Sequence, residues 1–220
     1  MHEFEIIKKY LSKLSKFNNS SLGLNDDVFF DKKKGLVITV DTYNHGIHFL
    51  NFKKPTLVIK KIIRSSISDL VCKGVVPKYY FISASGNKNT FSKKNLSKII
   101  KSLSQEQKKY KILLSGGDTT FSNKLSFTIT SIGFSNRIIY RNGAKLNDDI
   151  YVTGNLGDSF TGLQILKNKI RVKKKIKDYF LNKYYLPDIQ IGLTKQLLKF
   201  ANTSIDVSDG LIDDLDKMLN

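Results

Sequence analysis

The stretch KILLSGGDTT, residues 111–120, combines a short apolar run, two glycines and an acid. Residues 112–114 predict a buried strand, because a short apolar run bounded by glycine suits a covered position in a sheet. Gly116 and Gly117 predict a sharp turn and a close approach of the backbone to a ligand, since glycine lacks a Cβ atom. Asp118 would then lie at the tip of the strand, where α/β proteins place their ligands. The stretch therefore predicts an α/β fold with a ligand site near Asp118.

Other acids recur along the chain beside predicted strand ends, turns and one helix. They are Asp26, Asp27, Asp41, Asp69, Asp206 and Asp209. Asp26 and Asp27 would repel each other unless a positive group lies beside them, and an unpaired Asp69 within an apolar helix would be costly. The alternatives are an exposed turn for the 26–27 pair, surface exposure for Asp69, and helix capping for Ser208 and Asp209. Because aspartate binds hard cations well, we predict that these acids converge on metal ions and a nucleotide's phosphates.

Periodicity and turn signals predict an alternation of helices and strands. Residues 3–16 have apolar side chains at helical spacing, and Pro55 opens a helix for which Gly74 is the expected end. Residues 124–134 alternate apolar and polar side chains, as in a sheet with one covered face. We place a domain boundary near residue 146. Before it we also expect strands at 28–30, 36–41 and 78–85 and a helix at 92–110. After this boundary we expect a strand, a glycine turn and a helix within 150–166, and then a strand at 204–207. A last helix follows, capped by Ser208 and with Asp209 in its first turn.

The composition limits the class of protein. A length of 220 residues with 40% hydrophobic content suffices for packed cores. The net charge of +18 comes mostly from lysines spread over every segment, with only four arginines among 37 basic residues. Because arginine is the usual reader of bases and phosphates, this charge favours a biased composition over nucleic-acid binding. The single cysteine, Cys72, and the absence of a leader pattern or an apolar run of about 20 residues predict a cytoplasmic protein that does not cross a membrane.

Two histidines and one arginine are further candidates for binding. His45 and His48 stand three residues apart, but without a nearby cysteine or HExxH spacing they do not indicate zinc. We expect His48 to hydrogen-bond an anionic substrate and His45 to be solvated. Arg141, before the turn signal Asn142-Gly143, is either a phosphate contact or a solvated charge.

Several motifs together resemble the thiamine-monophosphate kinase family, whose superfamily also holds aminoimidazole ribonucleotide synthetase and selenide, water dikinase. The resembling segments, in family order, are HEFEII, GLNDD, VDTYNHGIHF, SISDLVCKG, LSGGDTT, RNGAKLNDDIYVTGNLGDS and SIDVSDGL. The resemblance implies an N-terminal α/β domain with a mixed sheet, residues 1–146, which binds ATP and magnesium and dimerises through its sheet. It also implies a second α/β domain that residues 147–220 begin and do not complete, so that an acid and an aromatic residue for the thiamine rings are missing.

Carried over position by position, the resemblance implies a set of ligands. The residues that would bind magnesium are Asp27, Thr39, Asp41, Asp69, Asp118, Asp206 and Asp209. Those that would contact ATP are Gly117, Asp118, Arg141 and Ser208, and His48 would contact thiamine phosphate. The chain departs from the family pattern at Asn25 (usually Asp), at Ser66 (usually Asn) and in the helix end LVCKG (usually rich in alanine). Since asparagine can coordinate through its carbonyl, we expect altered metal affinity rather than a different reaction.

The implied reaction is ATP-dependent phosphorylation of thiamine phosphate to thiamine diphosphate by in-line transfer, which needs no protein nucleophile. The implied partners are ATP, thiamine phosphate and a second copy of the chain, without nucleic acid or membrane. One alternative is another ATP-dependent enzyme of the same superfamily, which a substrate panel would separate. The other is a basic nucleic-acid-binding protein, whose binding would fall steeply with added salt.

Overall fold

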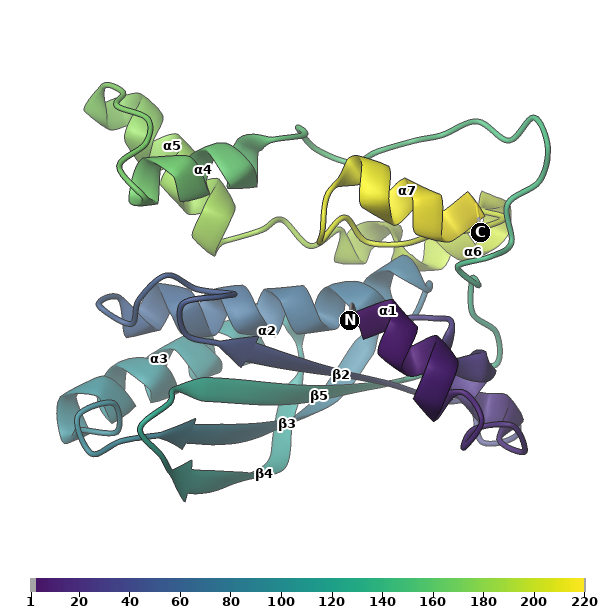
Figure 1. Cartoon of the computed structure of the whole chain (residues 1–220), viewed down its shortest axis with the longest axis horizontal. Helices are drawn as coiled ribbons and strands as arrows, with labels where there is room; N and C mark the ends of the chain where they lie inside the picture. Colours follow the sequence, from purple (N-terminus) through teal and green to yellow (C-terminus); the bar gives the residue numbers. More distant parts are fainter. Residues whose placement is uncertain (1–2, 220) are drawn as a thin grey trace.

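The structure is a computed structural model that describes residues 3–219; Met1, His2 and Asn220 lie outside the described part. It has three layers: a five-stranded mixed sheet, two long helices on one face of the sheet, and a helical second half stacked on those helices (Figure 1). The α/β class expected from the sequence is confirmed. The strands are β1 (Phe29–Asp31), β2 (Leu36–Asn44), β3 (Pro77–Gly86), β4 (Leu113–Phe121) and β5 (Ser126–Phe134).

The strands run in the order β1-β2-β5-β3-β4, with β3 and β4 parallel and the other neighbours antiparallel. In β5, buried residues alternate with partly exposed ones, as expected for a sheet with one covered face. Residues that share a row across a sheet point to the same face, so the register decides which side chains can meet. In one row Asp41 of β2 pairs with Ile129, which pairs with Ile82 of β3, and this row faces the helices.

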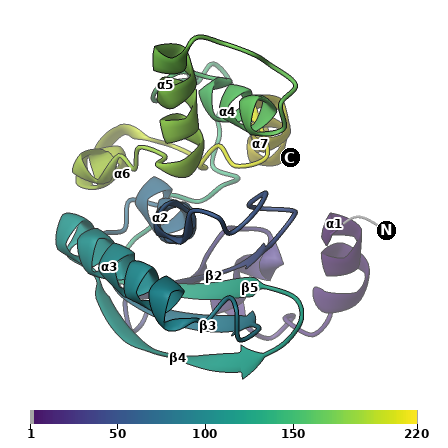
Figure 2. The same ribbon diagram turned by 90° about the vertical axis from the view of Figure 1, so that its left-hand side faces the viewer.

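Helix α2 (Pro55–Cys72) lies between the sheet and the second half of the chain (Figure 2). Pro55 opens it at a position where its missing N–H costs nothing, and Gly74, with φ +77°, follows its end as expected. Because α2 is covered on both sides, its buried apolar residues are spread around the helix: Val58, Ile59, Ile62, Ile63, Ile67, Leu70 and Val71. Beside it, α3 (Lys93–Tyr110) covers the sheet, and a buried ion pair of 2.8 Å between Arg64 and Glu106 joins the two helices.

The second half of the chain is helical. Its helices are α4 (Asp158–Leu166), α5 (Lys174–Tyr185), α6 (Thr194–Phe200) and α7 (Leu211–Leu219). Tyr184 and Tyr185 are buried in the same apolar cluster as α2, which packs the two halves together. Within residues 3–219 no strand follows β5, so the strands expected at 150–153 and 204–207 are wrong. A strand needs a hydrogen-bonding neighbour, and neither segment has one in the sheet. The domain boundary near residue 146 stays a prediction.

The N-terminal helix is shorter than its apolar spacing predicts. Helix α1 (Glu3–Ile6) continues as a π-helical turn, Ile7–Leu11, and ends there instead of near residue 16. The Ser12 hydroxyl donates to the Lys8 carbonyl at 2.7 Å, a local bond with which serine competes against helix continuation. Among residues 3–219 no helix combines the length and the apolar character needed to span a membrane.

The strand that contains Asp118 also differs from the prediction. Ile112 is buried, but Leu113 and Leu114 are 56% and 45% exposed, because β4 is an edge strand. The strand does not turn at the glycines; it runs through Gly117 to Phe121, so Asp118 lies inside it rather than at its tip. Asp41 likewise lies inside β2, which continues to Asn44.

Candidate functional site

Three acids from distant segments come together where α2 passes β2. Asp41 points from β2 toward the helices, Asp69 lies on α2, and Asp206 lies in the segment between α6 and α7. The charges of Asp41 and Asp206 both act on the Asp69 carboxyl group. The residue spacing of β2 explains part of this arrangement, because positions 39, 41 and 43 all point to the helical face.

Neutral donors from the same strand orient two of these acids. The Thr39 hydroxyl donates to Asp69 Oδ2 at 2.6 Å, and the Tyr43 hydroxyl donates to Asp41 Oδ2 at 3.0 Å. Neither donor brings a positive charge, so neither compensates the negative charge of the carboxylate that it orients.

The pKa values of the three acids reflect their burial and the charges of the neighbouring acids. Burial raises the pKa of Asp69 well above its usual range, and the charges of Asp206 and Asp41 raise it further. Burial also raises the pKa of Asp41, against the lowering effect of its hydrogen bond from Tyr43. Loss of hydration, with the charges of Asp27 and Asp41, raises the pKa of Asp206 to about 6. Raised pKa values of this kind are frequent at functional sites, because a bound cation would lower the free-energy cost of ionising the buried carboxyl groups.

The chain segment that carries Asp206 is tied down by two contacts to the first half. The Thr203 hydroxyl donates to the Arg141 carbonyl at 2.6 Å, and the Lys73 ammonium donates to the Ser204 carbonyl at 3.0 Å. These bonds hold residues 203–206 against the end of α2 and so bring Asp206 to the two acids of the first half.

The acids Asp26 and Asp27 obtain their positive neighbours from Lys73 and Arg141. Lys73 lies 2.9 Å from Asp26 and 2.8 Å from Asp27, and Arg141 lies 3.1 Å from Asp27. Arg141 is 6% exposed, which excludes the solvated-charge interpretation. Its side chain also donates to Asn25 at 3.0 Å. Apart from the presence of a lysine at an otherwise apolar helix end, nothing in the sequence indicates this role for Lys73.

His48 is exposed at the margin of the acid cluster, where its ring meets the edge of Tyr43. The Asn44 amide donates to His48 Nδ1 at 2.9 Å. In the neutral ring the proton therefore resides on Nε2, which leaves a hydrogen-bond donor for an anionic ligand. His45 is also exposed, as expected.

The loop before α7 is organised by Asp214, a residue that the sequence did not single out. Asp214 Oδ2 accepts the amides of Ser208, Asp209 and Gly210 at 2.9, 3.0 and 3.2 Å. The prediction that Ser208 caps α7 is wrong, because the helix begins at Leu211 and the loop amides are satisfied by a side chain of the helix. Asp209 precedes the helix and forms an ion pair of 2.6 Å with Lys217.

Asp118 does not join the other acids within one chain. It pairs with Ser83, which pairs with Thr128, which pairs with Thr42. This row lies on the face of the sheet opposite to Asp41, and β4 is three strands away from β2, or about 14 Å. Gly117 lies beside Asp118 on the same edge strand, so both are separated from Arg141 and Ser208.

Comparison with known proteins identifies the family. A family model described as AIR synthase related protein, N-terminal domain, matches residues 24–135. Thiamine-monophosphate kinase of Buchnera aphidicola subsp. Acyrthosiphon pisum is 37% identical over 227 residues, covering 99% of this chain and 69% of the relative. The chain belongs to the thiamine-monophosphate kinase family. The resemblance found in the sequence motifs is thereby confirmed.

Other thiamine-monophosphate kinases agree with this assignment. The enzyme of Haemophilus influenzae is 37% identical, covering 100% of this chain and 68% of the relative. The solved structure of AaThiL complexed with AMPPCP and TMP has a TM-score of 0.86 at 28% identity, covering 99% of this chain and 71% of that chain. The fold of the present chain is therefore that of the thiamine-monophosphate kinases over nearly its whole length.

The acid cluster of this chain has the donor chemistry for a divalent cation. Within residues 3–219, Asp41, Asp69 and Asp206 form no ion pair with a lysine or arginine and offer carboxylate oxygens, whereas Asp27 Oδ2 lies 2.8 Å from the Lys73 ammonium. Among the described residues, however, no three His, Cys, Asp or Glu side chains are placed closely enough to hold one metal ion without moving. Because carboxylates without a cation repel one another, the cluster is a set of suitable donors rather than a preformed cage.

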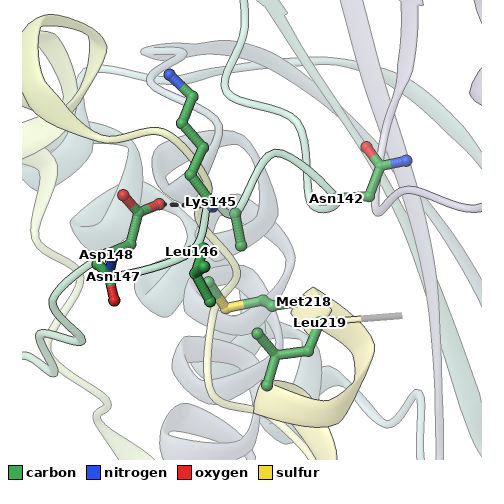
Figure 3. A pocket seen from close by; sticks show the side chains of 8 residues that line it. Asn142, Lys145, Leu146, Asn147, Asp148, Met218 and Leu219 are labelled. Atoms are coloured by element: carbon green, nitrogen blue, oxygen red, sulfur yellow. Dashed lines mark hydrogen bonds between the residues drawn. The ribbon is translucent and has the colours of Figure 1, made fainter.

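A separate pocket of about 550 Å³ lies between residues 142–148 and the end of α7 (Figure 3). Leu146, Met218 and Leu219 form its apolar side, and the Lys145 amide donates to Asp148 across its polar side at 2.8 Å. None of the predicted site residues lines it. The acid cluster, not this pocket, is therefore the candidate site.

The raised pKa of Asp206 predicts the pH dependence of stability in metal-free buffer. Between pH 3.8 and about 6 the folded chain keeps a proton on Asp206 that the unfolded chain has lost. Unfolding then releases protons, so the free energy of unfolding falls as pH rises through this window, by on the order of 1–3 kcal/mol in total. Urea titrations with a chelator between pH 4 and 7 measure this fall. Asp206→Asn should lessen this fall without abolishing it, because the raised pKa values of Asp41 and Asp69 still contribute, and an unchanged pH profile in that variant would contradict the prediction.

Proposed function

We propose that this chain transfers the γ-phosphoryl group of ATP to thiamine phosphate and so forms thiamine diphosphate. The observation that carries the proposal is the convergence of Asp41, Asp69 and Asp206 in a chain that belongs to a kinase family. A similar structure is complexed with AMPPCP and TMP, which supports the same pair of substrates.

Magnesium is the proposed metal, held by Asp41, Asp69 and Asp206 with Thr39 close by. When bound, it supplies positive charge that stabilises the phosphates during transfer. The chain's own contribution is positioning: the hydroxyls of Thr39 and Tyr43 hold two of the carboxylates in place. Since the acceptor is a phosphate oxygen that is largely ionised near neutral pH, the reaction requires no protein nucleophile and no dedicated base.

The substrates would be held by residues at the margin of the cluster. His48 Nε2 is the proposed donor to the phosphate of thiamine phosphate. For ATP we propose Gly117, Asp118, Arg141 and Ser208. Arg141 has a buried Nε–H without a hydrogen-bond partner, a donor that a phosphate oxygen can accept. Asp27 and Asp209, the further predicted metal ligands, are ion-paired with lysines in the structure.

A homodimer is proposed because it would complete the site with Asp118. Three edges of the sheet lack a neighbouring strand: the outer edge of β4, the outer edge of the short β1, and residues 39–44 of β2, since β1 pairs only with residues 36–38. A second copy that places its β4 beside this part of β2 would bring its Asp118 to Asp41. The face of the sheet away from the helices also carries exposed apolar side chains, Val40 at 61% and Phe134 at 51%, as surfaces that contact a partner often do.

Mixing two inactive variants tests this arrangement. We expect Asp118→Asn and Asp69→Asn to be inactive alone, and their equal mixture, after subunit exchange, to regain about a quarter of the wild-type rate, because half of the dimers are mixed and each has one intact site. The rate of the mixture is measured against each variant alone. A mixture that remains inactive although mixed dimers form would place Asp118 in the site of its own chain or outside it.

The direct test of function is a coupled measurement of both products. Purified chain, ATP, magnesium and thiamine phosphate should give ADP and thiamine diphosphate in equal amounts, and a chelator should stop the reaction. Thiamine and other phosphate-bearing acceptors form the control panel. ADP formation with another acceptor and not with thiamine phosphate would indicate a different ATP-dependent reaction of the same superfamily. Because ATP is the co-substrate, we propose the cytoplasm as its location.

A further inference from the structure

The Lys73 side chain, at the end of α2, is completely buried yet charged. Its ammonium is surrounded by three oxygens from two other segments: Asp26 Oδ1 at 2.9 Å, Asp27 Oδ2 at 2.8 Å and the Ser204 carbonyl at 3.0 Å. Two carboxylates and a carbonyl around one buried cation form the kind of oxygen shell that hard divalent cations also prefer.

The charges around Lys73 are balanced within the chain. Asp26 and Asp27 carry two negative charges, and Lys73 and Arg141 carry two positive charges at 2.8 to 3.1 Å from them. The remaining oxygen of Asp26 accepts the Arg141 amide at 3.0 Å. A buried ion pair is costly to form but very costly to leave with one partner removed, so this group holds together only as a complete set.

The other acids of the site differ in this respect. Asp41 and Asp69 receive hydrogen bonds from the hydroxyls of Tyr43 and Thr39, which are neutral. The acidic region therefore has two halves: one already neutralised by side chains of the chain itself, and one in which the hydrogen bonds to Asp41 and Asp69 come from neutral hydroxyls.

We infer that the Lys73 ammonium is a built-in cation that occupies the place of a divalent metal ion beside Asp26 and Asp27, and so confines metal binding to the half formed by Asp41, Asp69 and Asp206. This inference rests on the proposed function. Lys73 is thus a positioning residue: it does not reach the reacting atoms, and it acts by fixing Asp27 and, through Ser204, the segment that carries Asp206.

The test counts metal ions in the full chain without substrates. Mn²⁺ is titrated into wild-type protein, Lys73→Met and the matched control Lys88→Met, which makes the same change on an exposed loop. We expect Lys73→Met to bind one more Mn²⁺ per chain than wild type, and the control to bind the same number. We also expect saturating Mn²⁺ to raise the Tm of Lys73→Met by roughly 5–10 °C more than that of wild type, as binding of one further ion to the folded state implies.

Each outcome decides the inference. An equal number of ions and an equal rise in Tm in wild type and Lys73→Met would overturn it. If Lys73→Met does not fold in metal-free buffer, recovery of the folded protein on refolding with Mn²⁺ supports the inference, and failure to recover overturns it. Wild-type protein that binds no Mn²⁺ and forms no thiamine diphosphate would remove the proposed function itself. Normal binding and turnover in wild type, with no extra ion in the variant, would remove only the role of Lys73.

Discussion

We expect Asp69→Asn to abolish thiamine diphosphate formation and, in metal-free buffer, to make the protein more stable. The Asp69 carboxylate lies among the charges of Asp41 and Asp206 and receives only the Thr39 hydroxyl, so its charge is costly in the absence of a metal. Asparagine keeps the oxygen that accepts from Thr39 and removes the charge, which should raise the free energy of unfolding by about 1–2 kcal/mol. The same loss of charge removes a proposed magnesium ligand, so turnover should fall by about 10³-fold or more.

A rise in stability together with a loss of turnover would distinguish this explanation from general damage to the fold, which would lower both. Urea unfolding with a chelator measures the first effect, and thiamine diphosphate formation with saturating magnesium measures the second. Asp149→Asn makes the same change on an exposed loop and should alter neither. A variant that is less stable than wild type without metal would show that Asp69 has a stabilising partner in the folded chain. Turnover within tenfold of wild type would remove Asp69 from the site.

Local signals in the sequence were sufficient for the elements that form the scaffold of the site. Pro55 and Gly74 mark the two ends of α2, and the alternation in residues 124–134 marks β5 as a strand with one covered face. The acids Asp41 and Asp69 could be proposed as neighbours from motif resemblance, because each lies on an element whose position in the fold is fixed by apolar patterning. Where an apolar pattern decides the element, the sequence alone predicts the structure well.

Long-range packing decided the features that the sequence did not predict. Lys73 ends in a buried charge cluster because residues 26–27 and 203–206 fold over the end of α2, and nothing local to Lys73 indicates those segments. Asp118 lies far from Asp41 because β4 is added at the other edge of the sheet, a matter of strand order rather than of strand propensity. The segments 150–153 and 204–207 have strand-like composition but no neighbour to pair with, so propensity was overridden by context.

The role of the glycine pair before Asp118 was also decided by long-range packing, and its effect can be measured. Glycines beside a short apolar run suggest a turn, yet both lie inside β4 with φ of +150° and +152°. A bulge shifts the pairing of β3 with β4 between Tyr80 and Phe81, and there the two backbones approach very closely. A Cβ atom on Gly117 would lie 1.8 Å from the Ile82 carbonyl oxygen. The glycine is required by the neighbouring strand, not by a turn.

We therefore expect Gly117→Ala to lower the free energy of unfolding by about 3–5 kcal/mol, because the clash is with backbone and only separation of β3 from β4 relieves it. Gly116→Ala should cost less, since its Cβ would meet the Phe81 ring at 3.0 Å and a side chain can move. Gly192→Ala, with no atom within 4 Å, is the matched control and should leave stability unchanged. Chemical unfolding of the three variants gives the order directly. If Gly117→Ala were as stable as the control, β4 would not pair with β3 in this register, and the placement of Asp118 on the edge of the sheet would have to be abandoned.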